Sequence, residues 1–396
     1  MSKKKEAARR ERALRLSPLL VLVLVLVLLL LLEPSRIPWI IPKYGIDDKT
    51  TLLTWRAAAG LAKKVIRGIS RKKRQDGTSF HQYVAYNGMR DYQGKLSPVR
   101  VQNLVTSTAK TCRRFAKKNK IPHALIELAD GTVGHWLGPQ DAAHHVVFFH
   151  GGGYMAPALN KHMDFAFGFT KPLRKNLAVI VLQYSLATEK ANPYPCQLQQ
   201  AISLLDHLLH ERNISPNSII LLGDSAGGHL LIGLLLHFRH HNPKVNRLDV
   251  QGHFAGAAIV SPWLNLYAPA ESMKPGPQQD ILDPNSLVHW ANDFLAGAPS
   301  DPWNDPLTAP KDWWTGLPVD DILLTFGEDE LLRDGCATVA EILQQAHPST
   351  SVRRVAEEVH VHMIMNRFLL INRPCESEEF YTRWMDSHLA DKTKAG

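Results

Sequence analysis

Residues 223–227 read GDSAG, a serine between two glycines at the spacing of a serine nucleophile. The apolar run IILL precedes them, and the helix-like run LLIGLLLH follows shortly afterwards. A turn between a strand and a helix lifts the serine side chain clear of the sheet, and small neighbours permit the strained backbone. The helix that begins there directs its N-terminal N–H groups at the same place. The pattern predicts that Ser225 is a nucleophile.

A serine nucleophile needs a general base and a carboxylate that orients the base. Acidic side chains follow the apolar run ILLTF at 322–326, namely Glu328, Asp329, Glu330 and Asp334. Near the C-terminus, the stretch EEVHVHMIM offers His360 and His362. The order serine, acid, histidine is one of the known chain orders of a catalytic triad.

An acyl-transfer site must also stabilise the oxyanion of a tetrahedral intermediate with unobstructed backbone N–H groups. Residues 150–154 read HGGGY, directly after the strand-like run VVFF. We expect Gly151 and Gly152 to supply two N–H groups, and Ala226, the residue after the serine, to supply a third. The alternative, a glycine-rich turn chosen only for its shape, is disfavoured by the serine motif downstream. Neither GKS/T nor GxGxxG follows, so a phosphate-binding loop is not indicated.

Short apolar runs separated by helix-like segments must position these residues. A hairpin is predicted in residues 123–138 around the turn Asp130-Gly131. The later runs lie at 146–149, 177–182, 219–222, 257–260 and 322–326. Continuous apolar runs are typical of strands that are buried on both faces. Because these runs alternate with helix-like segments, we predict an α/β fold with a mostly parallel sheet flanked by helices.

Composition narrows the classes of function. The chain has 396 residues and a formal charge of +9, of which +5 falls in residues 1–32. The rest is mildly basic, without the basic and aromatic interleaving of a nucleic-acid-binding module, so no nucleic-acid partner is expected. The four cysteines are not at metal-binding spacings, so zinc is not indicated. The serine chemistry implies no metal and no organic cofactor. Oligomeric state and disulfide pairing stay open.

Residues 19–32 are fourteen uninterrupted apolar residues behind a basic segment, residues 1–18. The stretch is shorter than the ~20 residues of a typical spanning helix, and no small-residue cleavage pattern follows. We favour an uncleaved signal anchor with residues 1–18 in the cytosol and the catalytic domain in the lumen of the endoplasmic reticulum. A cleaved signal peptide and a monotopic segment are the alternatives. Asn213, in the sequon Asn-Ile-Ser, is then a glycosylation candidate.

Residues 52–74 form an apolar stripe at helical spacing with basic residues crowded at the end. This pattern fits a basic amphipathic helix on a membrane surface or at a pocket entrance, and it equally fits an ordinary helix packed on the main domain.

HGGGY together with GDSAGG resembles the hormone-sensitive-lipase-like family of α/β-hydrolases, which includes arylacetamide deacetylases and fungal steryl acetyl hydrolases. The resemblance covers roughly residues 120–385 and includes SPWLNL at 261–266. It implies an α/β-hydrolase catalytic domain at 121–390, with a cap formed by residues 34–120 and an insertion at about 264–315. The tryptophans of this region, Trp263, Trp290, Trp303, Trp313 and Trp314, are candidates to line an apolar pocket.

The resemblance also implies roles within the triad. The family's acid motif places Glu330 at the position of its catalytic aspartate, with Asp329 as the alternative and Asp334 in a supporting role. Its histidine motif aligns with His360 rather than with His362, which is then a packing residue.

The resemblance implies a serine hydrolase that cleaves carboxylic esters through an acyl-enzyme. We expect deacetylation of a small lipophilic ester, such as a sterol-like or secondary-metabolite acetate, by a membrane-bound enzyme. A broad carboxylesterase or lipase acting on acylglycerols or xenobiotic esters is one alternative. A ligand receptor on the same fold that has lost catalysis is another.

Overall fold

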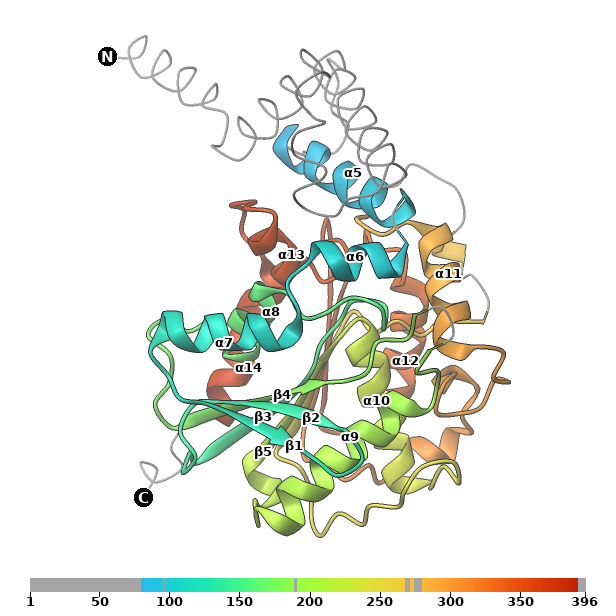
Figure 1. Ribbon diagram of the computed structural model, residues 1–396. Helices are drawn as coiled ribbons and strands as arrows, with labels where there is room; N and C mark the ends of the chain where they lie inside the picture. Colours follow the sequence, from blue (N-terminus) through green and yellow to red (C-terminus); the bar gives the residue numbers. More distant parts are fainter. Residues whose placement is uncertain (1–79, 96, 189–190, 268–270, 274–279, 391–396) are drawn as a thin grey trace. The chain divides into compact units, whose positions relative to one another are not determined.

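The computed structural model describes residues 80–390, apart from 96, 189–190, 268–270 and 274–279 (Figure 1). The chain divides into two compact units, Met1–Leu96 and Ser97–Gly396. Helix α5 (Phe80–Lys95) belongs to the first unit. The predicted basic tail 1–18, anchor 19–32 and basic helix 52–74 lie outside the described residues. None of the described helices is long and apolar enough to cross a bilayer.

An eight-stranded sheet in the order β1-β2-β4-β3-β5-β6-β7-β8 forms the centre of the second unit. Its strands are β1 (His123–Glu127), β2 (Val133–Leu137), β3 (His144–Phe149), β4 (Leu177–Gln183), β5 (Ile219–Asp224), β6 (Gly256–Val260), β7 (Ile322–Gly327) and β8 (Thr350–Val355). The hairpin β1–β2 and the pair β2–β4 are antiparallel, and the other neighbours are parallel. The predicted α/β fold with a mostly parallel sheet is confirmed.

The apolar runs became strands because both faces of the sheet are covered. Every residue of β5, β6 and β7 is buried. Strand β8 was not predicted, and its residues TSVRRV include two exposed arginines. This strand lies at the edge of the sheet, where pairing with β7 rather than burial holds it, so no continuous apolar run marks it.

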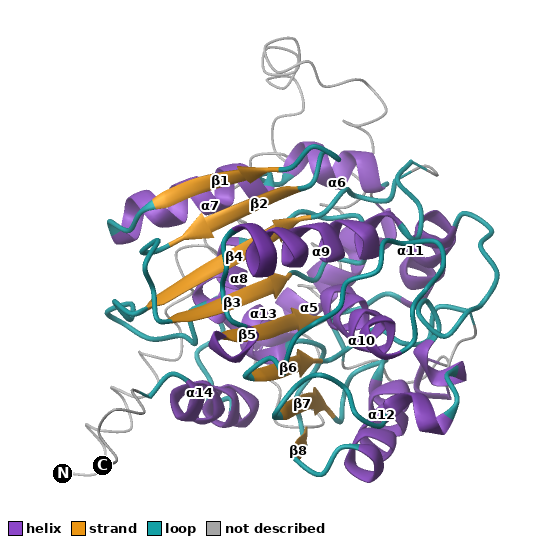
Figure 2. Cartoon of the chain, turned by 90° about the horizontal axis from the view of Figure 1, so that it is seen from below, coloured by secondary structure: helices purple, strands orange, loops and turns teal. Residues whose placement is uncertain are grey.

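Helices cover both faces of the sheet, with α7, α8 and α14 on one side and α9, α10 and α12 on the other (Figures 1 and 2). The helices of this unit are α6 (Pro98–Leu104), α7 (Thr108–Asn119), α8 (Asn160–Ala166), α9 (Cys196–Asp206), α10 (Ala226–Arg239), α11 (Pro284–Leu295), α12 (Arg333–Ala346), α13 (His362–Phe368) and α14 (Glu376–His388). The segment between β6 and β7 holds α11 and short 3₁₀ turns.

The parallel strands direct the chemically interesting loops to one edge. β3 ends before His150, β5 before Ser225 and β7 before the acidic loop that holds Glu330. Because the carboxyl ends of parallel strands lie at the same edge of a sheet, residues far apart in sequence meet there.

Candidate active site

Ser225 occupies a strained turn between β5 and α10. Its backbone angles are φ 52° and ψ −118°, a region that L-residues rarely adopt. Its N–H donates to Val260 O at 2.9 Å, and its carbonyl accepts from Trp263 N at 3.1 Å. The last residue of β6 and the loop that follows it therefore hold the turn in place. Gly227 has to be glycine because a Cβ there would collide with the carbonyl of Phe149 at the end of β3.

His360 approaches Ser225 from the loop after β8. Its Nε2 lies 2.9 Å from Ser225 Oγ, and both residues are buried. A neutral imidazole that accepts the serine proton at Nε2 carries its own proton on Nδ1. This is the arrangement of a general base with its nucleophile.

Glu330 lies on the other side of His360. Its Oε2 is 3.6 Å from His360 Nδ1, and neither atom has a hydrogen-bond partner in the described part of the chain. The two atoms face each other at ion-pair distance. Catalytic hydrogen bonds are often this long in the absence of substrate. The thiol of Cys336, on α12, lies 3.3 Å from the other carboxylate oxygen, Glu330 Oε1.

The charges around His360 tune its protonation. Burial by itself lowers the pKa of His360, but the carboxylates of Glu330, Asp280 and Asp224 outweigh it, so the pKa stands above its ordinary value. The same surroundings raise the pKa of the Cys336 thiol, through burial and through Glu330. Cys336 is therefore a neutral donor beside the acid rather than a second nucleophile.

The glycine loop corrects one sequence prediction. The N–H of Gly151, expected to bind an oxyanion, donates instead to Asp224 Oδ1 at 2.9 Å. Asp224 directly precedes the serine, so this bond fastens the loop to the turn. Among described residues, no acceptor takes the N–H groups of Gly152 and Gly153. Gly152 has φ +120°, a conformation that favours glycine.

Ala226 keeps its predicted place at the start of α10. As the first residue of the helix it has no intrahelical acceptor for its N–H. The described atoms therefore leave three N–H groups beside the serine turn, those of Gly152, Gly153 and Ala226, as candidates for an oxyanion hole.

Tyr154, the last residue of HGGGY, connects the loop to the segment between β6 and β7. Its hydroxyl donates to His229 Nδ1 at 2.6 Å, because His229 Nε2–H donates to the carbonyl of Asn304 at 3.1 Å. Burial lowers the pKa of His229 to about 4, which keeps it neutral in this relay. The Tyr154 ring stacks on Phe294 of α11 with centroids 3.9 Å apart.

Residues 146–364, more than half of the chain, match the family described as alpha/beta hydrolase fold. The chain belongs to this family. The match runs from β3 to α13 and so includes the glycine loop, the serine turn, the acid and the histidine.

Curated relatives of this α/β-hydrolase are distant. Steryl acetyl hydrolase 1 of Saccharomyces cerevisiae is 25% identical over 203 residues, which cover 47% of this chain and 45% of the relative. The putative acetyl-hydrolase LipR of Mycobacterium tuberculosis is 22% identical and covers 48% of this chain and 56% of its own. The chain thus spans about half the length of the curated relatives it matches.

Solved structures agree on the fold. A crystal structure of an esterase from the bacterial hormone-sensitive lipase family superposes with a TM-score of 0.58 at 21% identity, over 79% of this chain and 98% of that one. An esterase/lipase from an uncultured bacterium gives a TM-score of 0.56 at 20% identity, over 83% of this chain and 98% of that one.

Asp280, a buried carboxylate of this α/β-hydrolase, was not predicted from the sequence. Its Oδ1 accepts the N–H of His360 at 3.0 Å, and its Oδ2 accepts the N–H of Leu331 at 2.8 Å. Asp280 therefore ties the histidine loop to the acid loop. A single aspartate in a polar, proline-rich segment carries no sequence pattern, so only the tertiary contacts reveal it.

We expect Asp280→Asn to lower kcat/KM for an ester by about tenfold to a hundredfold, because hydrogen bonds to a charged group are worth about 1.5–3 kcal/mol. Catalysis needs neutral His360, so activity falls as the pH drops through its raised pKa. Removing the charge of Asp280 lowers that pKa and moves the acid limb of the kcat/KM profile to lower pH.

The pH profile distinguishes this effect from a structural one. Asp283→Asn is the matched control, because Asp283 caps α11 from the same segment and asparagine caps equally well. An acid limb that stays in place in Asp280→Asn would contradict the electrostatic role.

His362, the alternative base, does not face the serine. Its Nδ1 accepts the N–H of Val359 at 3.2 Å, and its Nε2 lies 2.7 Å from the amide nitrogen of Asn366. Glu358, His362 and Cys375 place atoms of metal-ligand type within 4.8 Å of one another. We assign no metal to them, because both ring nitrogens of His362 are already engaged within the protein.

The tryptophans predicted to line a pocket lie at different distances from the serine turn. Trp290 of α11 lies directly against Gly153, where an added Cβ would meet its ring at 2.6 Å. Trp303 and Trp313 pack instead on His240, just beyond the far end of α10. Because α10 has 14 residues and is about 20 Å long, these two lie away from Ser225.

Proposed function

We propose that this chain is a serine hydrolase that cleaves carboxylic esters through an acyl-enzyme. The observation that carries the proposal is the 2.9 Å contact between His360 Nε2 and Ser225 Oγ at the strained turn. The distant likeness to acetyl hydrolases and esterases supports the same chemistry.

Ser225 Oγ attacks the ester carbonyl while His360 takes its proton at Nε2. Glu330 stabilises the imidazolium that results, and the N–H groups of Gly152, Gly153 and Ala226 receive the oxyanion. His360 then protonates the leaving alcohol. Water, deprotonated by the same histidine, attacks the acyl-enzyme and releases the carboxylic acid. Asp329 and His362 take no part.

For the substrate, we propose a lipophilic acetate. The name of the yeast relative, a steryl acetyl hydrolase, supports acetate as the acyl group. Trp290, a large apolar ring against Gly153, restricts the space beside the oxyanion loop and favours a short acyl chain. The second candidate, a broader carboxylesterase or lipase, is supported by the esterase/lipase among the structural neighbours. The 2.9 Å contact disfavours a receptor without catalysis.

For location, we propose that residues 19–32 anchor the chain in the membrane of the endoplasmic reticulum with the catalytic domain in the lumen. The apolar run and its basic flank support this. Asn213 is exposed in the structure and so accessible to glycosylation there. A shift in electrophoretic mobility on treatment with endoglycosidase H, absent in Asn213→Gln, tests both proposals.

We expect rates with p-nitrophenyl esters to fall from acetate through butyrate and octanoate to palmitate, and release of free sterol from cholesteryl acetate. Initial rates at matched substrate concentration, with sterol release followed by chromatography, measure this. A preference for octanoate or longer chains would support the lipase candidate instead. If no ester is hydrolysed and a fluorophosphonate probe does not label the protein, the hydrolase proposal fails.

A further inference from the structure

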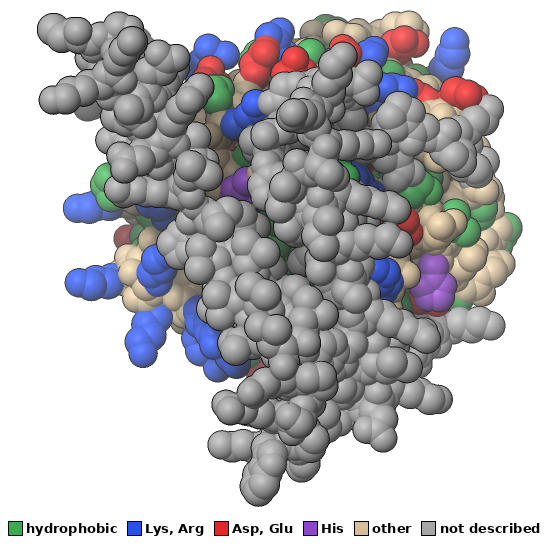
Figure 3. Space-filling view, turned by 90° about the horizontal axis from the view of Figure 1, so that it is seen from above, with side chains coloured by type: hydrophobic (Ala, Val, Ile, Leu, Met, Phe, Trp, Pro, Cys, Tyr) green, Lys and Arg blue, Asp and Glu red, His purple; other side chains and the backbone are tan. Residues whose placement is uncertain are grey.

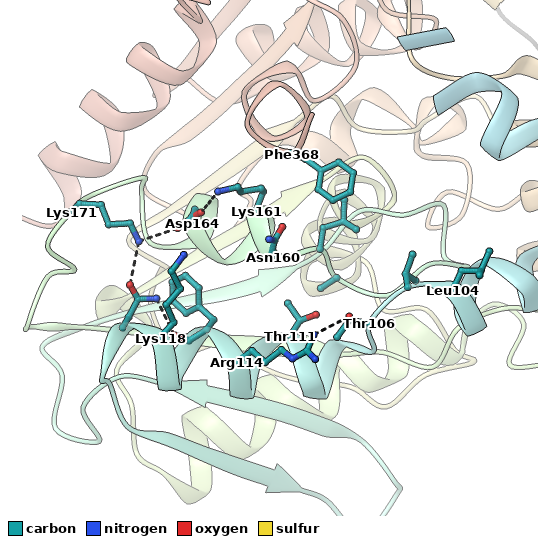
Figure 4. A pocket seen from close by; sticks show the side chains of 15 residues that line it. Leu104, Thr106, Thr111, Arg114, Lys118, Asn160, Lys161, Asp164, Lys171 and Phe368 are labelled. Atoms are coloured by element: carbon teal, nitrogen blue, oxygen red, sulfur yellow. Dashed lines mark hydrogen bonds and ion pairs between the residues drawn. The ribbon is translucent and has the colours of Figure 1, made fainter. Parts of the chain in front are cut away.

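A cavity of about 410 Å³ lies between α7, the start of α8 and the end of α13 (Figure 4). None of Ser225, Glu330 and His360 lines it. The cavity is therefore separate from the serine turn, and binding there does not require the hydrolase chemistry.

Cationic side chains surround this cavity. Arg114, Lys118, Lys161 and Lys171 all line it, against a single carboxylate, Asp164. Asp164 pairs with Lys161 at 3.1 Å and with Lys171 at 3.0 Å. In the described part of the chain, no carboxylate pairs with Arg114 or Lys118. Among the described residues, the side chains that line the cavity therefore carry a net positive charge that no carboxylate balances.

The charge continues along α7. All five lysines and arginines of this helix are exposed, as is Lys120, which caps it. No aspartate or glutamate occurs from residue 97 to residue 126. Figure 3 shows lysine and arginine side chains gathered on the left of the visible face, the side on which Figure 1 places α7.

Apolar side chains are exposed at the same cavity. Leu104 is 61% exposed and Phe368 is 37% exposed, and both line it. Leu370, two residues beyond Phe368, is 56% exposed. Few large apolar side chains in the described residues are so exposed, and two of them, Leu104 and Phe368, line this cavity. Soluble anions alone do not explain exposed leucine and phenylalanine beside the cations.

We propose that this cavity and its rim bind an anionic phospholipid at a membrane surface. Arg114 and Lys118 contact the phosphate and carboxylate of the headgroup, and Leu104 and Phe368 enter the acyl layer beside it. A surface that combines basic and apolar side chains in this way binds the membrane–water interface. The basic side chains attract anionic lipids, and the apolar side chains are buried in the acyl layer.

The test uses the full chain and sedimentation with vesicles of phosphatidylcholine, with or without phosphatidylserine. The predicted anchor contributes to both mixtures, so the readout is the ratio of the two partition coefficients. Arg114→Glu with Lys118→Glu is expected to lower this ratio by at least about tenfold, because each basic residue near an anionic surface contributes substantially to binding. Arg114→Gln with Lys118→Gln, a milder pair, should lower it less.

Arg247→Glu with Lys311→Glu is the matched control, because both residues are exposed and neither lines the cavity. Equal ratios for the two glutamate pairs would overturn the proposal. Leu104→Ser with Phe368→Ser should weaken binding to both vesicle types without changing the net charge, and unchanged binding would contradict the apolar half of the site.

A second measurement locates the contact. Phosphatidylserine vesicles should protect Lys118 from acetylation by acetic anhydride, followed by mass spectrometry, and should leave Lys311 reactive. Equal protection of Lys118 by inorganic phosphate alone would mean a site for small anions and would overturn binding at a membrane surface.

Discussion

Ser225→Ala is expected to reduce kcat for ester hydrolysis by about a millionfold, the size of effect seen when a serine nucleophile is removed from a triad. The reason is the loss of the only oxygen that His360 Nε2 contacts at 2.9 Å in the described structure. Initial rates with p-nitrophenyl acetate and labelling by a fluorophosphonate probe measure this, and both should disappear together.

Ser349→Ala provides the control for this variant. Ser349 is exposed in the turn before β8, so the substitution makes the same chemical change away from the site. It should retain both rate and labelling. If Ser225→Ala hydrolysed esters at the rate of Ser349→Ala, the turn between β5 and α10 would not be the catalytic centre.

Glu330→Gln is expected to lower kcat by about ten thousandfold, comparable to the effect of amidating the acid of a serine triad. The Glu330 carboxylate lies 3.6 Å from His360 Nδ1 and supports the charged imidazole. A neutral amide keeps the shape but cannot stabilise the imidazolium, and it can leave the ring with the wrong tautomer. Steady-state rates across pH measure the loss.

Asp329→Asn distinguishes the two candidate acids. Asp329 is adjacent to Glu330 and only half-buried, and its N–H donates to the carbonyl of Glu358 at 2.9 Å. We expect less than a tenfold change, because the carboxylates that raise the pKa of His360 are those of Glu330, Asp280 and Asp224. A larger loss in Asp329→Asn than in Glu330→Gln would reverse the assignment of the triad acid.

Patterns of consecutive residues were sufficient to predict the fold class and part of the candidate active site. Buried parallel strands must be apolar along their whole length, so the runs at β3 to β7 were visible without neighbours. The strained turn at Ser225 needs small residues next to it, so it can also be recognised from a short run of consecutive residues. Strand β8 was not predicted, because the stability of an edge strand depends on pairing with its neighbour rather than on the burial of its own side chains.

Hydrogen bonds to residues distant in sequence decide which polar groups are available for catalysis. A local sequence pattern therefore does not reveal them. Gly151 illustrates this, since the HGGG pattern reveals glycines but not that Asp224, 73 positions later, accepts the first N–H. Cys336 and Asp280 likewise have no motif of their own, yet they contact Glu330 and His360 in the folded chain.

The sequence by itself determined the α/β architecture, the serine on its turn, and a short set of acids and histidines that could complete the site. The tertiary structure decided among them, because it places Glu330 and His360 rather than Asp329 and His362 in line with Ser225. It also brought the basic face of α7 together with exposed Leu104 and Phe368 around one cavity. Short-range patterns encode backbone conformation, whereas contacts between side chains depend on how separate elements pack.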